Sequence, residues 1–214
     1  MKPSKIAFVG YGALGKQISH MLSFSYPNHE FHVFDDIAHE SKCANYTYPF
    51  SACFDEKYFD FDFYIGIGYK HLSKKLKIIE SLLKLGRQLP SIIHTSSYRD
   101  LSSKVGQGAV VYPMCNLDRN SIIGKGSIIN NSVVISHDCE IGDCCYLSPG
   151  CVLSGQVKIG SCVFLGTGVL VANGVTIGSN AVVGIGSVVT SDVPSGASVI
   201  GNPMRLLKKT LQIL

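Results

Sequence analysis

The sequence lacks the features that would place the protein in a membrane or send it across one. None of its apolar stretches is long enough to span a bilayer. Its beginning shows no charged segment leading into an apolar run and a cleavage site. We therefore expect a cytoplasmic protein with no membrane span.

Strong charge and metal-ligand spacing are missing as well. The formal net charge is only +4 for 214 residues, and the basic residues do not predict the broad basic face that DNA requires, so no nucleic-acid partner is expected. Cys144 and Cys162 stand eighteen residues apart with neither CxxC spacing nor a nearby histidine. No metal site is predicted.

A six-residue period dominates the second half of the chain. Neither a helix nor a strand has this period, so it predicts a repeat solenoid. The aliphatic residues that follow it are Val105, Val111, Leu117, Ile123, Ile129, Ile135, Ile141, Leu147, Leu153, Ile159, Leu165, Val171, Ile177, Val183 and Val189.

The other positions of the hexads agree with this interpretation. A small or slim residue follows each aliphatic by four positions, and glycine often comes directly after the aliphatic, as a tight turn with little room for Cβ requires. Three hexads then form one triangular coil, and residues eighteen apart lie above one another. This pattern predicts a parallel β-helix, in which stacked coils satisfy the backbone hydrogen bonds. Four cysteines at the small position are expected to be core residues, namely Cys115, Cys139, Cys145 and Cys151.

The first half begins with the order of a nucleotide-binding βαβ unit. An apolar strand over 5–9 leads into the GxGxxG turn at 10–15, a helix over 16–25 follows, and a strand over 31–34 ends in Asp35 and Asp36. A third strand is expected over 61–67 and a helix over 72–85. Only one such half precedes the repeats, so the unit is too short for a dinucleotide and has room for one nucleotide.

Two interpretations of this unit stay open. Asp35 could accept hydrogen bonds from a ribose while the glycine turn and helix N-terminus receive phosphate. Alternatively, the glycines merely form a tight turn in an α/β cap. The sequence thus predicts a Rossmann-like α/β unit over 1–90, a connecting segment over 91–104, the all-β helix over 105–198 and a tail over 199–214.

One histidine in the repeats is a candidate base. His137 comes two residues after inward Ile135 and should face outward, and the residue stacked above it is Gly155, so no side chain blocks the space beside the imidazole. A ligand could lie there. Asp138 and Glu140 are both near enough in sequence to raise the basicity of the ring and fix its tautomer, as a general base requires. The alternative is an incidental surface histidine.

These motifs together resemble a known family. The GxGxxG turn, the Asp35-Asp36 pair and the segments at 92–94, 137–143, 147–150 and 199–205 look like the sugar acetyltransferases of the PglD/NeuD type, over nearly the whole chain. The resemblance implies a left-handed β-helix, a homotrimer, and transfer of acetyl from acetyl-CoA to an amino or hydroxyl group of a bacterial surface sugar, often nucleotide-linked. It implies His137 as the base and Asp138 as the residue that increases its basicity.

The resemblance also implies the binding residues. The nucleotide-linked amino sugar is expected along Gly12, Ala13, Leu14, Asp35, Asp36 and Gly68, and the coenzyme along Tyr146, Gly155, Thr167 and Ile185. Two departures from the family pattern affect this transfer. Tyr146 stands where the family usually has histidine, and Lys70 and Ser73 stand where it commonly has asparagine and arginine.

The function predicted from the sequence is N-acetylation of a nucleotide-linked amino sugar by direct transfer, with no metal. The first alternative is O-acetylation of a sialic acid or related sugar. A different class is a non-catalytic trimeric scaffold whose N-terminal unit senses a nucleotide. An NAD-dependent oxidoreductase is disfavoured, because the second half offers no catalytic domain for it.

Overall fold

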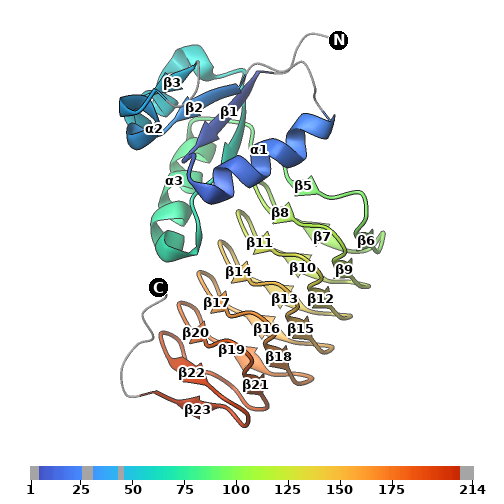
Figure 1. Cartoon of the computed structure of the whole chain (residues 1–214). Helices are drawn as coiled ribbons and strands as arrows, with labels where there is room; N and C mark the ends of the chain where they lie inside the picture. The colour runs from blue at the N-terminus through green and yellow to red at the C-terminus, as the bar shows by residue number, and fades with distance from the viewer. Residues whose placement is uncertain (1–4, 26–30, 43–45, 208–214) are drawn as a thin grey trace. The chain divides into compact units, whose positions relative to one another are not determined.

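The computed structural model describes residues 5–25, 31–42 and 46–207 (Figure 1). The chain divides into two compact units, residues 1–90 and 91–214, and each is described by itself. The last seven residues of the expected tail, 208–214, lie outside the described residues. No helix in the described ranges is both long and apolar enough to cross a membrane.

The first unit is built on a parallel four-stranded sheet. Its strand order is β3-β2-β1-β4, with β1 (Ile6–Val9), β2 (Phe31–Phe34), β3 (Thr47–Tyr48) and β4 (Asp62–Ile65). All four residues of β1 are buried, as expected for a strand with a neighbour on both sides. The helices are α1 (Ala13–Ser25), α2 (Asp36–Glu40) and α3 (Leu72–Lys84), with short 3-10 turns η1 (Phe50–Phe54), η2 (Glu56–Tyr58) and η3 (Tyr69–His71).

The glycine turn between β1 and α1 is close-packed. Gly10 has φ +84°, which favours glycine. A Cβ on Gly15 would collide with the carbonyl oxygen of Gly10, and a Cβ on Gly66, just after β4, would lie 2.6 Å from Cα of Gly15. Gly12 differs, because a Cβ there would meet nothing within 4 Å. Two of the three motif glycines are therefore required by the packing of the turn itself.

The second unit is a parallel β-helix, as the period predicts. Most strands pair in parallel with the strand eighteen residues later, as Ile123 pairs with Ile141 and Ile135 with Leu153. In the last coil the spacing is sixteen residues, since Val183 pairs with Val199. The chain passes in turn through three sheets, which we call I, II and III (Figure 1).

Sheet I contains β5 (Ile92–Ile93), β8 (Val110–Val111), β11 (Ile128–Ile129), β14 (Tyr146–Leu147), β17 (Phe164–Leu165), β20 (Val182–Val183), β22 (Ser198–Ile200) and β23 (Arg205–Leu206). Sheet II contains β6 (Tyr98–Arg99), β9 (Asn116–Leu117), β12 (Val134–Ile135), β15 (Val152–Leu153), β18 (Leu170–Val171) and β21 (Val188–Val189). Sheet III contains β7 (Lys104–Val105), β10 (Ile122–Ile123), β13 (Glu140–Ile141), β16 (Lys158–Ile159) and β19 (Thr176–Ile177).

The interior of the β-helix is filled by the two inward residues of each hexad. The period's aliphatic residues from Val111 to Val189 are buried and form one continuous core. The four cysteines predicted for the small position are at most 2% exposed, and the thiol of Cys139 donates to the carbonyl of Ser154 at 3.1 Å. The prediction that these cysteines are core residues is confirmed.

Stacked glycines make one edge of the prism tight. Gly106, Gly124, Gly142, Gly160 and Gly178 follow one another at intervals of eighteen, and a Cβ on any of them would lie within 3.0 Å of atoms of the next coil. On Gly124 it would collide with the carbonyl group of Gly142. Space for the neighbouring backbone, rather than a positive φ, explains why glycine follows the aliphatic at these positions.

The coils extend further at both ends than the sequence predicts. The segment 91–104, expected as a connection, carries β5, β6 and β7, which pair with β8, β9 and β10. The expected tail begins inside β22, which pairs in parallel with β20 and antiparallel with β23. The early coil was hidden because Arg99, which is exposed, stands where the period requires an aliphatic residue. Its guanidinium donates to the carbonyl of Ser103 at 2.9 Å.

Candidate active site

The predicted base lies at the corner between sheets II and III. His137 follows β12 by two residues, and its side chain is 44% exposed. An ideal Cβ on Gly155 would lie 2.5 Å from both Cε1 and Nε2 of His137. The space above Gly155 is therefore filled by the imidazole itself. This corrects the expectation that the glycine leaves a vacant place beside the ring for the thioester.

Asp138 holds the ring in one tautomer. Its Oδ2 lies 2.9 Å from Nδ1 of His137. An ionised carboxylate can only accept a hydrogen bond, so Nδ1 carries the proton and Nε2 keeps its lone pair. Asp138 has φ +57°, a left-handed conformation that aspartate tolerates better than most residues, and this turn brings its side chain back toward its neighbour.

A second coil holds Asp138 in place. The side-chain amide of Asn120, eighteen residues earlier, donates to Oδ1 of Asp138 at 2.9 Å. This hydrogen bond, with a smaller contribution from the bond to His137, keeps the pKa of the Asp138 carboxyl below its usual value. Arg119 Nη2 approaches Oδ2 at 3.5 Å, but its side chain is 63% exposed and contributes little. The carboxylate therefore stays ionised and oriented.

Glu140 does not join this group. It begins β13, and its carboxylate lies 3.7 Å from Nζ of Lys158 on the next coil. The prediction that Glu140 helps to tune His137 is wrong, because successive residues of a strand point to opposite faces and Glu140 points outward from sheet III.

Asn173 is a polar neighbour of this corner that sequence reasoning missed. Its Oδ1 lies 3.0 Å from the ideal Cβ position of Gly155, on the opposite side of the glycine's coil from His137. The backbone N–H of Gly174 donates to the carbonyl of Gly155 at 3.0 Å, which fixes this stacking. The eighteen-residue spacing from Gly155 was the signal that could have found it.

Except for Gly155, the residues expected along the coenzyme lie elsewhere on the β-helix. Thr167 and Ile185 occupy the corner between sheets I and II, in one column, and the carbonyl of Thr167 accepts from the N–H of Gly186 at 2.9 Å. Both residues are exposed. Tyr146 lies on sheet I, where its hydroxyl accepts from Asn130 Nδ2 at 3.0 Å and its ring stacks on Phe164. Sheet II separates the Thr167 corner from the His137 corner within one subunit.

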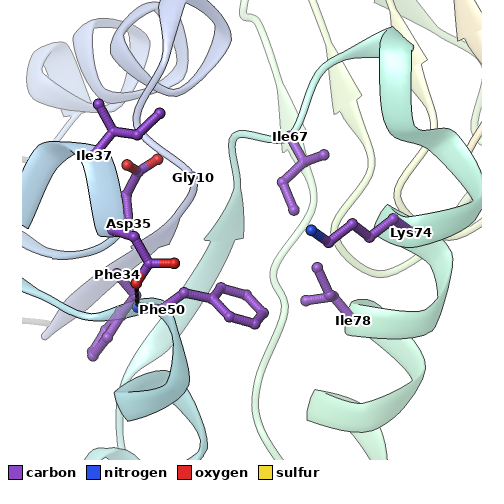
Figure 2. A pocket seen from close by; sticks show the side chains of 9 residues that line it. Gly10, Phe34, Asp35, Ile37, Phe50, Ile67, Lys74 and Ile78 are labelled. Carbon is purple, nitrogen blue, oxygen red and sulfur yellow. Dashed lines mark hydrogen bonds between the residues drawn. The ribbon is translucent and has the colours of Figure 1, made fainter.

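The first unit contains a pocket of about 220 Å³ at the carboxyl ends of its strands. Of the residues expected along the nucleotide-linked sugar, Asp35 and Asp36 line this pocket. Gly12, Ala13, Leu14 and Gly68 do not, although Gly10 and Ile67 near them in the chain do. The sequence did not identify Lys74 and Ile78 of α3, which face Phe50 across the pocket (Figure 2). The pocket thus has apolar walls with charged groups at its edge.

Both carboxylates already have structural partners. Asp35 caps α2 by accepting from the N–H of Ala38 at 2.9 Å, and its other oxygen accepts from the N–H of Tyr11 at 2.8 Å. Asp36 accepts from the N–H of Phe50 at 2.8 Å. Each oxygen has a further lone pair for a ligand hydroxyl, so the two roles are compatible. No group of three possible metal ligands occurs among the residues that the structure describes.

Comparison with known proteins agrees with the two units and their order. The family described as bacterial transferase hexapeptide (six repeats) matches residues 120–155. The acetyltransferase domain of PglB from Neisseria gonorrhoeae FA1090, solved with acetyl coenzyme A, is 28% identical, with a TM-score of 0.86 over 96% of this chain and 100% of that one. These similarities support a hexapeptide-repeat acetyltransferase of the PglD/NeuD type. Its β-helix is accordingly left-handed.

Two further structures resemble this acetyltransferase over most of its length. PerB from Caulobacter crescentus, solved with CoA and GDP-perosamine, is 27% identical, with a TM-score of 0.85 over 95% of this chain and 97% of that one. WeeI from Acinetobacter baumannii AYE is 26% identical, with a TM-score of 0.83 over 95% and 100%. A search of curated proteins found no match to the sequence.

Proposed function

We propose that this acetyltransferase moves the acetyl group of acetyl-CoA to the amino group of a nucleotide-linked sugar, with His137 as general base. The observation that carries the proposal is the contact of His137 Nδ1 with Asp138 at 2.9 Å, which leaves Nε2 as a proton acceptor at an exposed corner. The relatives solved with acetyl coenzyme A or with CoA and GDP-perosamine support both substrates.

The reaction is a direct transfer in a ternary complex. The amine nitrogen attacks the thioester carbonyl carbon while Nε2 of His137 takes one of its protons, and the carbon–sulfur bond then breaks. The proton on the imidazolium passes to the departing sulfur, so CoA leaves as a thiol. No serine or cysteine nucleophile takes part. Asp138 stabilises the imidazolium and holds its orientation.

The active site is completed by a second copy of the chain. An acetyl-CoA held along Thr167 and Ile185 belongs to the corner between sheets I and II, whereas His137 stands at the corner between sheets II and III. In a homotrimer, the corner between sheets I and II of one subunit meets the corner between sheets II and III of its neighbour. Tyr146 and Gly155 belong to the same proposed coenzyme path.

The pocket of the first unit is the proposed nucleotide site. Its apolar walls suit a base, the carboxylates of Asp35 and Asp36 suit ribose hydroxyls, and the ammonium of Lys74 suits a phosphate. Gly12, Ala13 and Leu14, at the start of α1, and Gly68 are proposed to line the continuation of the site toward the diphosphate.

The first experiment measures release of free thiol from acetyl-CoA across a panel of UDP-, dTDP- and GDP-linked amino sugars. At least one amino sugar is expected to give turnover, and His137→Ala is expected to lower it about a hundredfold or more with acetyl-CoA binding preserved. Faster turnover of hydroxyl acceptors would favour O-acetylation of a sialic acid or related sugar. Failure to bind acetyl-CoA would favour a non-catalytic scaffold.

A second experiment tests the shared site. His137→Ala and a variant blocked at the coenzyme corner, Thr167→Trp with Ile185→Trp, are each expected to be inactive. Mixed and reassembled trimers place an intact His137 beside an intact coenzyme corner at some interfaces and should regain a fraction of the activity. Mixed trimers that remain inactive would show that the two corners do not cooperate between subunits.

A further inference from the structure

Two polar side chains flank the glycine in the column that contains His137. His137, Gly155 and Asn173 follow one another at intervals of eighteen residues, at the same corner of three successive coils. Nε2 of His137 lies 2.5 Å, and Oδ1 of Asn173 3.0 Å, from the point that a Cβ on Gly155 would occupy. Both atoms therefore lie close to Gly155, at one exposed corner of the β-helix.

A side-chain contact with Gln156 indicates the orientation of the Asn173 amide. Its Nδ2 lies 3.5 Å from Oε1 of Gln156, which turns the amide nitrogen away and leaves Oδ1 directed at Gly155. The backbone of Gln156 is fixed at the same corner, because its N–H donates to the carbonyl of His137 at 2.9 Å. The corner thus presents two acceptors, an imidazole nitrogen and an amide oxygen.

Two acceptors match the hydrogens of an attacking amine. A primary amine has two N–H groups and one lone pair, whereas a hydroxyl has a single O–H. Two N–H···acceptor bonds of about 2.9 Å from one tetrahedral nitrogen reach acceptors roughly 4.7 Å apart. Their distances of 2.5 Å and 3.0 Å from the Gly155 position keep Nε2 and Oδ1 within little more than this separation, so a nitrogen placed outside the coil is near enough to reach both.

We propose that Asn173 is a second catalytic residue, whose Oδ1 accepts one N–H of the sugar amine while His137 Nε2 accepts the other. With both hydrogens engaged, the nitrogen lone pair points out of the corner toward the thioester carbon. His137 removes its proton as the carbon–nitrogen bond forms. The hydrogen bonded to Asn173 stays on nitrogen and becomes the N–H of the product amide.

This inference rests on the proposed function and narrows it to amine acceptors. A hydroxyl acceptor would give its one hydrogen to His137 and have none for Asn173. The side chain would then contribute to the rate with amines and not to the rate with the corresponding hydroxyl sugars, so Asn173 favours N-acetylation over O-acetylation.

The test compares kcat/KM for the best amino-sugar nucleotide and for its hydroxyl analogue in three variants. Asn173→Ala should lower the value for the amine about tenfold, as loss of one hydrogen bond in the transition state predicts, and leave the hydroxyl analogue unchanged. Asn173→Asp keeps an acceptor oxygen and should retain most of the amine activity. Asn116→Ala is the control, since that exposed asparagine lies on β9 of sheet II, away from the corner.

The outcomes separate this inference from the proposed function. If the wild type turns over amines and Asn173→Ala stays within twofold of it, Asn173 has no catalytic role. If Asn173→Asp is as inactive as Asn173→Ala, the amide acts as a donor and the assignment of Oδ1 is wrong. Equal losses with amine and hydroxyl acceptors would also overturn it. A wild type that acetylates no amine would remove the proposed function and this inference together.

Discussion

The imidazole of His137 occupies the space that a Cβ atom on Gly155 would need, 2.5 Å from both Cε1 and Nε2. Gly155→Ala should therefore push the ring out of the corner. We expect turnover to fall at least roughly tenfold through lost orientation of the base. The melting temperature should change little, because Gly155 has no positive φ and the imidazole is the free end of a side chain.

Gly124→Ala is the matched control for this substitution. Its new Cβ would collide with the backbone of Gly142, which cannot rotate away. Overpacking of this kind costs about 1–3 kcal/mol, so the melting temperature should fall in thermal unfolding. If Gly155→Ala lost stability and Gly124→Ala did not, the assigned contacts at both glycines would be wrong.

Asp138→Asn tests the tautomer of His137. The amide can donate to Nδ1, which then becomes the acceptor and moves the ring proton to Nε2, where it blocks general base catalysis. General base catalysis typically increases the rate about 10²–10⁴-fold, so partial loss of the base should lower kcat roughly tenfold to a hundredfold. KM for acetyl-CoA should stay the same. Steady-state rates that match the wild type would mean that Asp138 does not set the tautomer.

Tyr146→Phe tests the proposed contact of this residue with the coenzyme. The variant keeps the stacking on Phe164 and removes the hydroxyl that accepts from Asn130. A lost hydrogen bond of about 0.5–1.5 kcal/mol should raise KM for acetyl-CoA several-fold, with a smaller effect on kcat. Initial rates at varied acetyl-CoA measure this; an unchanged KM would place the coenzyme away from Tyr146.

Lys74→Ala tests the pocket of the first unit. Lys74 lines the pocket beside Ile67 and Ile78 and is the basic side chain among its lining residues (Figure 2). Loss of a charge-assisted bond to phosphate should raise KM for the nucleotide sugar about tenfold and leave KM for acetyl-CoA unchanged. Lys77→Ala on the same helix is the control, since Lys77 does not line the pocket. Equal effects of both substitutions would argue for a general charge effect.

Native cysteines in the core should resist alkylation. Burial raises the pKa of the Cys145 thiol to about 12 and that of Cys151 to about 11. Iodoacetamide at pH 8, followed by peptide mass spectrometry, should leave both unmodified until the protein is denatured. Rapid labelling of either in the native protein would contradict the stacked core.

The same shifts predict the effect of alkali on stability. Unfolded thiols ionise near the ordinary value of 9.0, whereas the folded thiols hold their protons to higher pH. The folded state therefore binds more protons between pH 9 and 12, and the free energy of unfolding decreases as pH rises through that range. Thermal unfolding measured from pH 7 to pH 11 should show the decrease. Cys145→Ala with Cys151→Ala should reduce its slope.

The repeats could be predicted from sequence because their signal is local. Ile123, Ile135 and their equivalents recur at a fixed spacing, and that spacing also gives the register between coils. The first coil escaped this logic, since Arg99 takes an aliphatic position through hydrogen bonds to Ser103 that leave no periodic trace. A period shows where coils repeat, but not where a polar residue replaces one member.

The site could be predicted only in part. Proximity in sequence brought His137 and Asp138 together, yet it also suggested Glu140, whose strand points it toward Lys158. Asn120 and Asn173 belong to other coils and required the eighteen-residue register to be applied to side chains as well as to the core. On α3, composition alone does not tell Lys74 from its neighbouring lysines; only the helix orientation places it at the pocket.

The fixed register of the coils also limits how this chain can change in length during evolution. Gain or loss of eighteen residues adds or removes one complete coil and keeps every later side chain on the same sheet or corner of the β-helix. Gain or loss of another number disturbs this register unless a corner absorbs the change, as in the last coil, where Val183 pairs with Val199 sixteen residues later and both stay buried. The length of the β-helix should therefore vary by duplication or loss of entire coils, with smaller insertions confined to outward bulges at the corners.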